Sequence, residues 1–389
     1  MKNFIFLLFT LLFLSGSVKS QWVDLNGPNQ GKIYSLGVIG TKIFAGTEQN
    51  GIYLSANSGS TWNAANTGLP ASSYVSSIIV SDASNIFAST WGGGVFLTTN
   101  SGASWSAMNS GLNDLSVRTL IKSGTTFFAG TQGGHLYSST NNCSLWNSVH
   151  VFPYAVVSIS VSGSTIFIAT ETEIYYSLNN GTSWINTGSF TYGPTSIVLS
   201  GTNVIVGTSN DIYKTIDNSN WTTSLSGEWA NTIMGMYNLC IFIGSNGHGL
   251  RLSINNGVSW SPMTYNSGVN SGLIDPYIYS FAVDGAYIYA GTSSSVYRKS
   301  LSSLTLIKED NINKEIITFP NPVKNELMIE FKGNKEKINF EILNSLGQIV
   351  FNGEFEENII VNTSNFASGI YELKLENGKY FEIKKIVIE

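Results

Sequence analysis

The chain has 389 residues, with 20 Lys and Arg against 25 Asp and Glu, for a formal net charge of −5. This length allows one large domain with an ample hydrophobic core and a second, smaller domain. Because the balance is acidic and residues 21–305 contain no extended Lys/Arg run, a nucleic-acid-binding surface is excluded.

The N-terminus has the pattern of a secretory signal peptide. Lys2 precedes the apolar run Phe4–Leu14, and small residues lead to Ser20-Gln21. The run is too short to span a bilayer as a helix, and no later stretch is long and apolar enough to do so. We therefore expect residues 1–20 to be removed near Ser20-Gln21 and the mature protein to be exported, without a transmembrane segment.

A short pattern recurs six times between Ser55 and Trp260, beginning with Ser55-Ala-Asn57-Ser-Gly59-Ser-Thr-Trp62. The third copy has Cys143 in place of Gly, and the fifth copy is one residue shorter. The copies share an Asn or Asp at the third position and a final Trp: Asn57 and Trp62, Asn100 and Trp105, Asn141 and Trp146, Asn179 and Trp184, Asp217 and Trp221, Asn255 and Trp260. A fixed repeat indicates many copies of one supersecondary unit, none of which buries its apolar face alone.

A second marker precedes each of these motifs, an apolar strand such as Ile43-Phe-Ala-Gly-Thr47. Its seven copies, the last being Ile288–Thr292, lie about 40 residues apart, which is the length of a four-stranded propeller blade. In the first unit we expect Tyr34–Val38 innermost, then Ile43–Thr47, Gly51–Ser55 and a strand opening at Trp62. The sequence therefore predicts an all-β chain with a seven-bladed β-propeller over residues 21–305.

The last unit stops after its third strand, Val296–Ser300. Gln21–Pro28 resembles the outer strand Thr61–Pro70, so we expect Trp22 to supply the missing strand and close the ring, which removes a free sheet edge. Trp22 and the six repeat residues then account for seven of the nine Trp, leaving Trp91 and Trp229 outside the pattern.

The repeated motif resembles the Asp-box, or BNR repeat, of bacterial sialidases, sortilin-type propellers and photosystem II assembly factors. The resemblance covers Gln21–Ser300 and implies a structural turn. Its Asn or Asp would accept a hydrogen bond from the backbone two residues on, and its Gly would adopt positive φ. The Trp would pack as an apolar anchor between blades.

The composition changes near Leu306 from Ser, Gly and Asn to Lys and Glu, with residues 306–318 as a linker. Alternating apolar residues with Asn/Gly turns predict a small immunoglobulin-like β-sandwich over residues 319–389. Its motifs resemble the C-terminal sorting domain of type IX secretion cargo from Bacteroidetes, through Pro320, Asn321, Pro322, Gly347, Gly369, Tyr371, Lys384 and Lys385. The resemblance implies the type IX machinery as partner, export across the outer membrane, removal of this domain and attachment to surface polysaccharide. The alternative is an ordinary immunoglobulin-like appendage.

The two cysteines fall in blades that lie nearly opposite each other, Cys143 in the third and Cys240 in the sixth. Because Cα atoms more than about 7 Å apart cannot be bridged, we expect two unpaired thiols.

Loops that join an outer strand to the next inner strand share one propeller face with the loops between second and third strands. The repeated turns lie on the other face. The first face is expected to carry His135, His248 and the long insertion Thr264–Pro276, together with the ligand-binding candidates Trp91, Trp229, Tyr154, Tyr192, Asp275, Tyr277 and Arg118. Arg118 is placed on an innermost strand, in the slot of Ser35, Ser158 and Ser280. Aromatic rings beside polar groups on a concave face fit a carbohydrate, whereas loop packing is the alternative for each Trp.

A glycoside hydrolase is the enzymatic alternative, because the Asp-box resemblance includes sialidases, whose site has an arginine triad, a Tyr–Glu pair and an Asp acid. This chain has three arginines, and two of them, Arg251 and Arg298, fall on third strands. A sialidase is therefore disfavoured, and the Phe/Tyr-Arg-Ile-Pro motif is missing. Another glycosidase could use Glu171 or Glu173 with Asp211.

We expect neither metal nor cofactor. His135, His150 and His248 lack metal-ligand spacing, and Gly92–Gly94 lacks the Lys-Ser/Thr and helix of a phosphate loop. The expected function is a secreted or cell-surface, non-enzymatic binding or adhesion module for a glycan or a protein. The alternatives are a glycoside hydrolase and an assembly factor for another surface protein.

Overall fold

The computed structural model describes residues 22–28, 31–200, 203–235, 240–262, 272–273, 275–301, 315–332, 337–344, 348–376 and 381–388. Within these ranges the regular structure is β-strand, without an α-helix. The chain divides into two compact units, Met1–Leu306 and Ile307–Glu389, which are described separately. The expected signal peptide, residues 1–20, lies outside the described residues.

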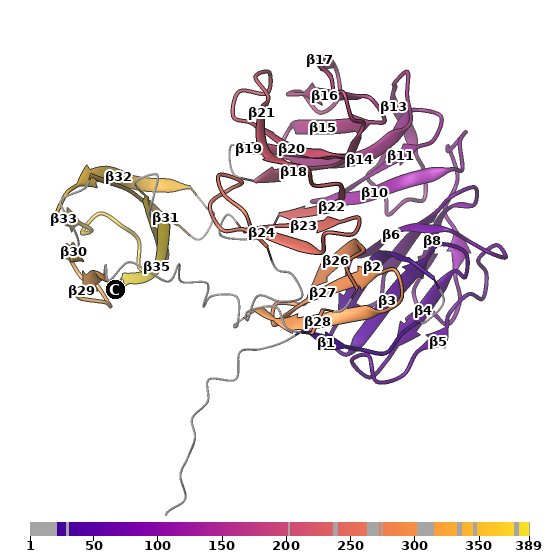
Figure 1. The fold of residues 1–389 in the computed structure, drawn as a ribbon, viewed down its shortest axis with the longest axis horizontal. Coiled ribbons are helices and arrows are strands. Elements are labelled where there is room, and N and C mark those ends of the chain that lie inside the picture. The colour runs from indigo at the N-terminus through magenta and orange to yellow at the C-terminus, as the bar shows by residue number, and fades with distance from the viewer. Residues whose placement is uncertain are drawn as a thin grey trace, which may run out of the picture. The chain divides into compact units, whose positions relative to one another are not determined.

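The first unit contains seven four-stranded antiparallel sheets, which are the blades of a propeller (Figure 1). The first three blades, each from the innermost strand outward, are β2 (Ile33–Ile39), β3 (Lys42–Thr47), β4 (Ile52–Ser55) and β5 (Asn63–Ala64); β6 (Val75–Val80), β7 (Ile86–Thr90), β8 (Gly94–Thr98) and β9 (Ser106–Ala107); β10 (Val117–Ser123), β11 (Thr126–Thr131), β12 (His135–Ser139) and β13 (Asn147–Val151). The next two are β14 (Val156–Ser162), β15 (Thr165–Thr170), β16 (Glu173–Ser177) and β17 (Ile185–Ser189); β18 (Pro194–Ser200), β19 (Asn203–Thr208), β20 (Asp211–Thr215) and β21 (Thr222–Ser226). The last two are β22 (Ala230–Gly235), β23 (Ile241–Ser245), β24 (Leu250–Ser253) and β25 (Ser261–Pro262); β26 (Ile278–Val283), β27 (Tyr287–Thr292), β28 (Val296–Ser300) and β1 (Val23–Asp24).

The ring closes as the sequence predicts. Each innermost strand contacts the innermost strand of the next blade, and β26 of the last blade contacts β2 of the first. The N-terminal strand β1 pairs with β28, with Val23 opposite Arg298, and Figure 1 shows the two strands side by side. Trp22 is 3% exposed, so the closing segment is held by packing as well as by backbone hydrogen bonds.

The second strands are buried because each blade packs on its neighbours. Phe44, Phe87 and Phe127 from three successive second strands are fully buried, and the rings of Phe87 and Phe127 lie 4.5 Å apart between centroids. The small residue near the end of the second strand, Gly46 in the first blade, is required by packing. A Cβ on Gly46 would lie 2.7 Å from Val75 Cγ1 of the next blade, so the close approach of the two blades requires glycine there.

The repeated turn is stabilised by its own side chains. In the first copy Ser55 Oγ donates to Asn57 Oδ1 at 3.0 Å and accepts from the Gly59 amide at 2.8 Å. Asn57 Oδ1 accepts from the Thr61 amide at 2.9 Å. The Asn therefore bonds the backbone four residues on, where the sequence predicted two, because the full-length turn wraps its backbone around the side-chain amide. The expected spacing of two residues occurs only in the shortened fifth copy, between Asp217 and Ser219.

The repeat Trp side chains join neighbouring blades, as predicted. Trp105 Nε1 donates to the Ala65 carbonyl at 2.9 Å, and Trp146 Nε1 donates to the Met108 carbonyl at 2.9 Å. Each acceptor lies just after the outer strand of the preceding blade, so one side chain supplies both apolar packing and a bond between blades.

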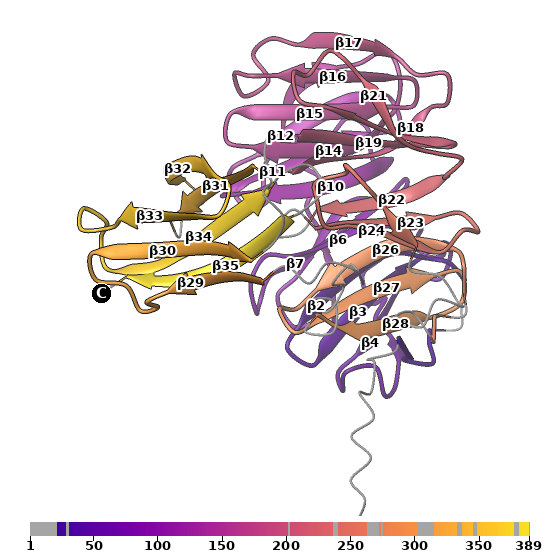
Figure 2. The ribbon, with the colours of Figure 1, turned by 60° about the vertical axis from the view of Figure 1, so that its left-hand side comes forward.

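The second unit is a small β-sandwich, shown in Figure 2. One sheet has the order β29 (Glu315–Phe319), β30 (Glu326–Lys332), β33 (Asn358–Asn362), and the other β32 (Ile349–Phe355), β31 (Ile338–Leu343), β34 (Gly369–Glu376), β35 (Phe381–Ile388). Side chains of both sheets, including Leu327, Phe340 and Leu373, form a single buried core.

Several residues of the predicted sorting motif tie this sandwich together. Asn321 Oδ1, between Pro320 and Pro322, accepts from the Val387 amide at 2.9 Å. The Tyr371 hydroxyl donates to the Ala367 carbonyl at 2.8 Å. Gly369 opens β34, and Lys384 and Lys385 lie on β35, whereas Gly347 is outside the described residues.

Candidate binding cavity at the propeller axis

Every blade has a β-bulge at the start of its innermost strand. The pairing register with the second strand shifts after the first residue of the inner strand and leaves one residue unpaired. Six of these bulged residues line a cavity of about 430 Å³ at the propeller axis, namely Tyr34, Ser76, Arg118, Val157, Thr195 and Tyr279. Loop residues including Trp91, Glu171 and Trp229 complete the lining.

The strand register corrects the position predicted for Arg118. The sequence placed Arg118 in the slot of Ser35, Ser158 and Ser280, but the residue in that slot is Thr119, which pairs with Gly130 as Ser35 pairs with Gly46. The prediction was wrong by one residue, because the bulge recurs in every blade and Arg118 corresponds to the bulged Tyr34, Val157 and Tyr279 rather than to the serines that follow them. Arg118 still lines the axial cavity, together with Thr119 that follows it.

A row of hydroxyl side chains follows the bulges and links neighbouring inner strands. Ser77 Oγ accepts from the Leu120 amide at 3.1 Å, and Ser196 Oγ accepts from the Ile233 amide at 2.9 Å. Where the ring closes, Ser280 Oγ donates to the Ile33 carbonyl at 2.8 Å. These hydroxyls replace the backbone ladder that the splayed inner strands do not form, and Ser77 and Ser196 also belong to the cavity lining.

One side of the cavity is formed by four aromatic rings, which we call the aromatic wall: Tyr279, Tyr34, Tyr74 and Trp91. The centroids of Tyr279 and Tyr34 lie 5.1 Å apart, those of Tyr34 and Tyr74 lie 4.7 Å apart, and Tyr74 meets Trp91 edge-on at 5.1 Å. Burial raises the pKa of Tyr74, so its hydroxyl stays protonated at physiological pH. The wall crosses the ring closure, because Tyr279 belongs to the last blade and Tyr34 to the first.

The aromatic wall ends at an ion pair. Arg118 Nη1 donates to Glu171 Oε1, and the Arg118 guanidinium carbon lies 5.2 Å from the centroid of the Trp91 ring. Glu171 lies in the turn between β15 and β16, 53 residues further along the chain. These two side chains are the charged residues in the lining of the cavity among the residues that the structure describes.

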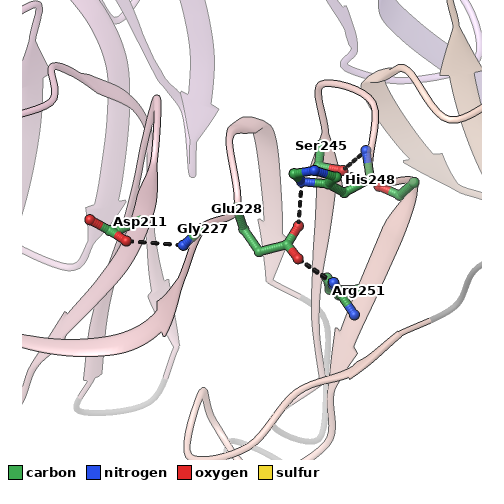
Figure 3. Close-up of polar contacts among 7 residues, drawn as sticks. Asp211, Gly227, Glu228, Ser245, His248 and Arg251 are labelled. Carbon is green, nitrogen blue, oxygen red and sulfur yellow. Dashed lines mark hydrogen bonds and ion pairs between the residues drawn. The ribbon is translucent and has the colours of Figure 1, made fainter.

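Trp229 reaches the cavity from the loop before β22, and the residue before it is buried. Glu228 is 4% exposed, and its Oε1 accepts from Arg251 Nε at 2.9 Å and from Arg251 Nη2 (Figure 3). Its Oε2 lies 3.5 Å from His248 Nδ1. The same loop is held by Asp211 Oδ1, which accepts from the Gly227 amide at 3.1 Å. Glu228 therefore anchors the segment that presents Trp229.

Sequence reasoning missed Glu228, and also Tyr34, Tyr74 and Tyr279. An acidic residue directly before an off-pattern Trp was the available signal for Glu228. Its partner Arg251 lies 23 residues further on. The three tyrosines sit at inner-strand starts, and aligning the bulges would have found Tyr34 and Tyr279.

The other predicted ligand residues lie away from the cavity lining. Tyr154, Tyr192 and Tyr277 are exposed on loops of the same propeller face. Asp275 is 8% exposed, and its carboxylate accepts from the Tyr277 amide and from the hydroxyls of Ser293 and Ser294. Asp275 thus joins its own loop to the turn between β27 and β28. Most of the insertion Thr264–Pro276 lies outside the described residues.

The three candidate catalytic carboxylates are separated in role. Glu171 lines the cavity, Asp211 supports the Trp229 loop, and Glu173 accepts a hydrogen bond from the Tyr175 hydroxyl. Burial, followed by that hydrogen bond, raises the pKa of Tyr175 to about 12. Within the described ranges no three His, Cys, Asp or Glu side chains gather as a metal site would require.

Both cysteines are free thiols, Cys143 buried in the third repeated turn and Cys240 just before β23. The described part of the chain contains no helix that is long and apolar enough to cross a membrane.

Residues 318–389 match the family model of the secretion system C-terminal sorting domain. Comparison with curated proteins gives no match. Among solved structures, the chain is similar to PorZ, described as an essential bacterial surface component of the type-IX secretion system of Porphyromonas gingivalis, with 14% identity and a TM-score of 0.56. The match covers 94% of this chain but 60% of PorZ, so the chain spans less than two thirds of that protein.

Two further structures share the fold. YCF48 from Cyanidioschyzon merolae is 11% identical with a TM-score of 0.57, and the match covers 72% of this chain and 98% of YCF48. The extracellular domain of the putative one component system BT4673 from B. thetaiotaomicron is 13% identical with a TM-score of 0.60, over 94% of this chain and 52% of that one. At these identities the likeness shows the fold alone. Together with the matched tail, it establishes the chain as a β-propeller that carries a type IX secretion sorting domain.

Proposed function

We propose that this protein is a surface-displayed binding module that holds a carbohydrate in its axial cavity without cleaving it. The observation that carries the proposal is the aromatic wall, Tyr279, Tyr34, Tyr74 and Trp91, facing a lining rich in hydroxyls and backbone. Sugar rings need flat apolar surfaces for their C–H faces and oriented polar groups for their hydroxyls. The cavity volume of about 430 Å³ lies in the usual range of small-ligand sites.

The exposure of the Trp side chains supports a ligand role over loop packing. Trp91 is 44% exposed and Trp229 is 45% exposed, whereas the repeat residue Trp105 is 4% exposed. Large aromatic side chains held half-exposed in a cavity keep apolar surface available to a ligand. The pair between buried Glu228 and Arg251 also supports a ligand role, because it fixes the loop that holds Trp229 in that exposed position.

The site lacks the paired carboxylates of a glycoside hydrolase among the described residues. Both retaining and inverting mechanisms need two carboxyl groups flanking one bond. Glu171 is the carboxylate in the described lining, and Arg118 occupies it. Binding without turnover is therefore the activity that this arrangement favours.

A role in assembly is the second candidate. PorZ is a surface component of the type-IX secretion system, and another structure of this fold is YCF48 bound to the D1 peptide, at a TM-score of 0.58. In this view the protein would hold a segment of another surface protein. For either role, we propose the same export steps: signal-peptide cleavage near Ser20-Gln21, loss of residues 319–389 after export, and tethering to surface polysaccharide.

The test is a glycan-array screen of the protein without residues 1–20, with reducing-end release measured on every hit. We expect binding without release, and loss of at least tenfold in affinity in Trp91→Ala and Trp229→Ala. Tyr192→Ala is the matched control, because Tyr192 is equally exposed but lies outside the lining. Release of reducing ends would contradict the proposal, and retention of one protein partner without any glycan binding would favour the assembly role.

A further inference from the structure

Charge inside the axial cavity is balanced by one pair of side chains. Of the lining residues, Arg118 carries a positive charge and Glu171 a negative one, and they are bonded to each other. The remaining lining consists of aromatic rings, hydroxyl groups, small apolar side chains and glycine. The described lining therefore offers no charge that is left over for a ligand.

Both residues of this ion pair, Arg118 and Glu171, are held in position by neighbouring parts of the propeller. The Arg118 guanidinium lies over Trp91, and its backbone belongs to the innermost strand of the third blade. The Glu171 amide donates to the Ala155 carbonyl at 3.1 Å, which ties the turn to the preceding loop. On its other side a Cβ on Gly193 would lie 2.3 Å from the Glu171 carbonyl oxygen, so the next loop packs directly against this turn. Glu171 thus reaches Arg118 from a fixed backbone position.

We infer that Glu171 sets the charge specificity of the cavity, so that it accepts neutral glycans and rejects acidic ones. This inference rests on the proposed carbohydrate-binding function. An acidic ligand that pairs with Arg118 would compete with a carboxylate that is already tethered beside it, and displacing that carboxylate exchanges one ion pair for another. The displaced Glu171 would then repel the ligand. A neutral sugar leaves the pair intact and meets the aromatic wall alone.

The decisive variant is Glu171→Gln, which keeps the shape of the side chain and removes its charge. Glu171 is half-exposed, so the substitution should leave folding unchanged. Two sugars that differ only in their C6 group serve as probes, methyl β-D-glucoside and methyl β-D-glucuronide, titrated by tryptophan fluorescence. We expect the wild-type protein to prefer the glucoside. Glu171→Gln should shift the preference toward the glucuronide by at least about fivefold, and Arg118→Met in the same chain should abolish that shift.

A measurement without sugar separates this inference from the proposed function. Quenching of tryptophan fluorescence by iodide should increase in Glu171→Gln, because an uncompensated Arg118 next to Trp91 attracts the anion. Quenching by neutral acrylamide should not change, and Trp91→Phe should remove the increase.

The outcomes are distinct. If no sugar binds any variant, the proposed function fails, and the iodide result still decides whether Glu171 neutralises Arg118. Equal binding of the two glycosides by the wild-type protein would overturn the inference while leaving carbohydrate binding in place. Unchanged iodide quenching in Glu171→Gln would overturn it as well.

Discussion

Removing the positive partner of Glu228 should strongly destabilise the propeller. Glu228 is 4% exposed, and Arg251 bonds its Oε1 through two nitrogens. Its Oε2 has no hydrogen bond of its own and lies 3.5 Å from His248 Nδ1. In Arg251→Met the carboxylate would stay buried without the guanidinium, beside the exposed His248 imidazole.

The magnitude follows from the burial of Glu228. Removing one partner of a buried ion pair typically costs about 3–5 kcal/mol, because the remaining charge has lost both water and its counter-charge. Replacing both partners by apolar groups of similar size is often close to neutral. We therefore expect a loss of about 3 kcal/mol or more in Arg251→Met, and a much smaller loss in the double variant Glu228→Leu, Arg251→Met.

Urea unfolding followed by tryptophan fluorescence is the assay, because all nine Trp lie in residues 22–260 and report on the propeller rather than on the tail. Lys214→Met, at a half-buried position on β20, provides a control for loss of a positive charge. A loss below about 1 kcal/mol in Arg251→Met, or a double variant as unstable as the single one, would refute the reasoning. The same variant should also weaken ligand binding, since Glu228 anchors the Trp229 loop.

Three further predictions are checked by the same unfolding assay or by labelling of a cysteine with iodoacetamide. Trp22→Ala should cost about 3–5 kcal/mol because it removes a buried side chain at the ring closure. Val23→Ala, at the next residue, which is 50% exposed, should change stability by less than about 1 kcal/mol. Similar values for the two variants would contradict closure by this segment. Gly68→Ala should cost at least about 2 kcal/mol more than Gly40→Ala. Both glycines have positive φ, but a Cβ at Gly68 would lie 2.1 Å from the Trp105 carbonyl oxygen, whereas a Cβ at Gly40 would meet nothing within 4 Å. Burial raises the pKa of the Cys143 thiol to about 12, so iodoacetamide should leave it unmodified at pH 8.5 until the protein unfolds. Because the unfolded thiol ionises first, near its ordinary value of about 8.5, stability should fall as the pH rises from there toward 12, and Cys143→Ala should fall less; rapid labelling of the folded protein would show that the thiol is accessible.

The blade architecture could be predicted from the sequence because its determinants are local. The turn around Asn57 and Gly59 forms its hydrogen bonds within eight residues, so each copy can be recognised from its own short sequence. The apolar strand ending at Thr47 recurs with the blade because every second strand is buried in the same way. Ring closure by Trp22 was also predictable, since a missing outer strand at one end matched a spare one at the other. The order of the tail motifs likewise indicated the sorting domain that residues 318–389 match.

The cavity was decided by tertiary structure, because its contacts join residues from different blades. Arg118 occupies the bulge of its inner strand and Thr119 follows it, and the pairing of Thr119 with Gly130 fixes which of the two matches the serines of the other blades. The aromatic wall exists only once the ring has closed and brought Tyr279 beside Tyr34. The Arg118–Glu171 and Glu228–Arg251 pairs link residues 53 and 23 positions apart. Sequence periodicity reports which face of a strand is buried within one blade, whereas the identity of an axial site depends on how seven inner strands converge.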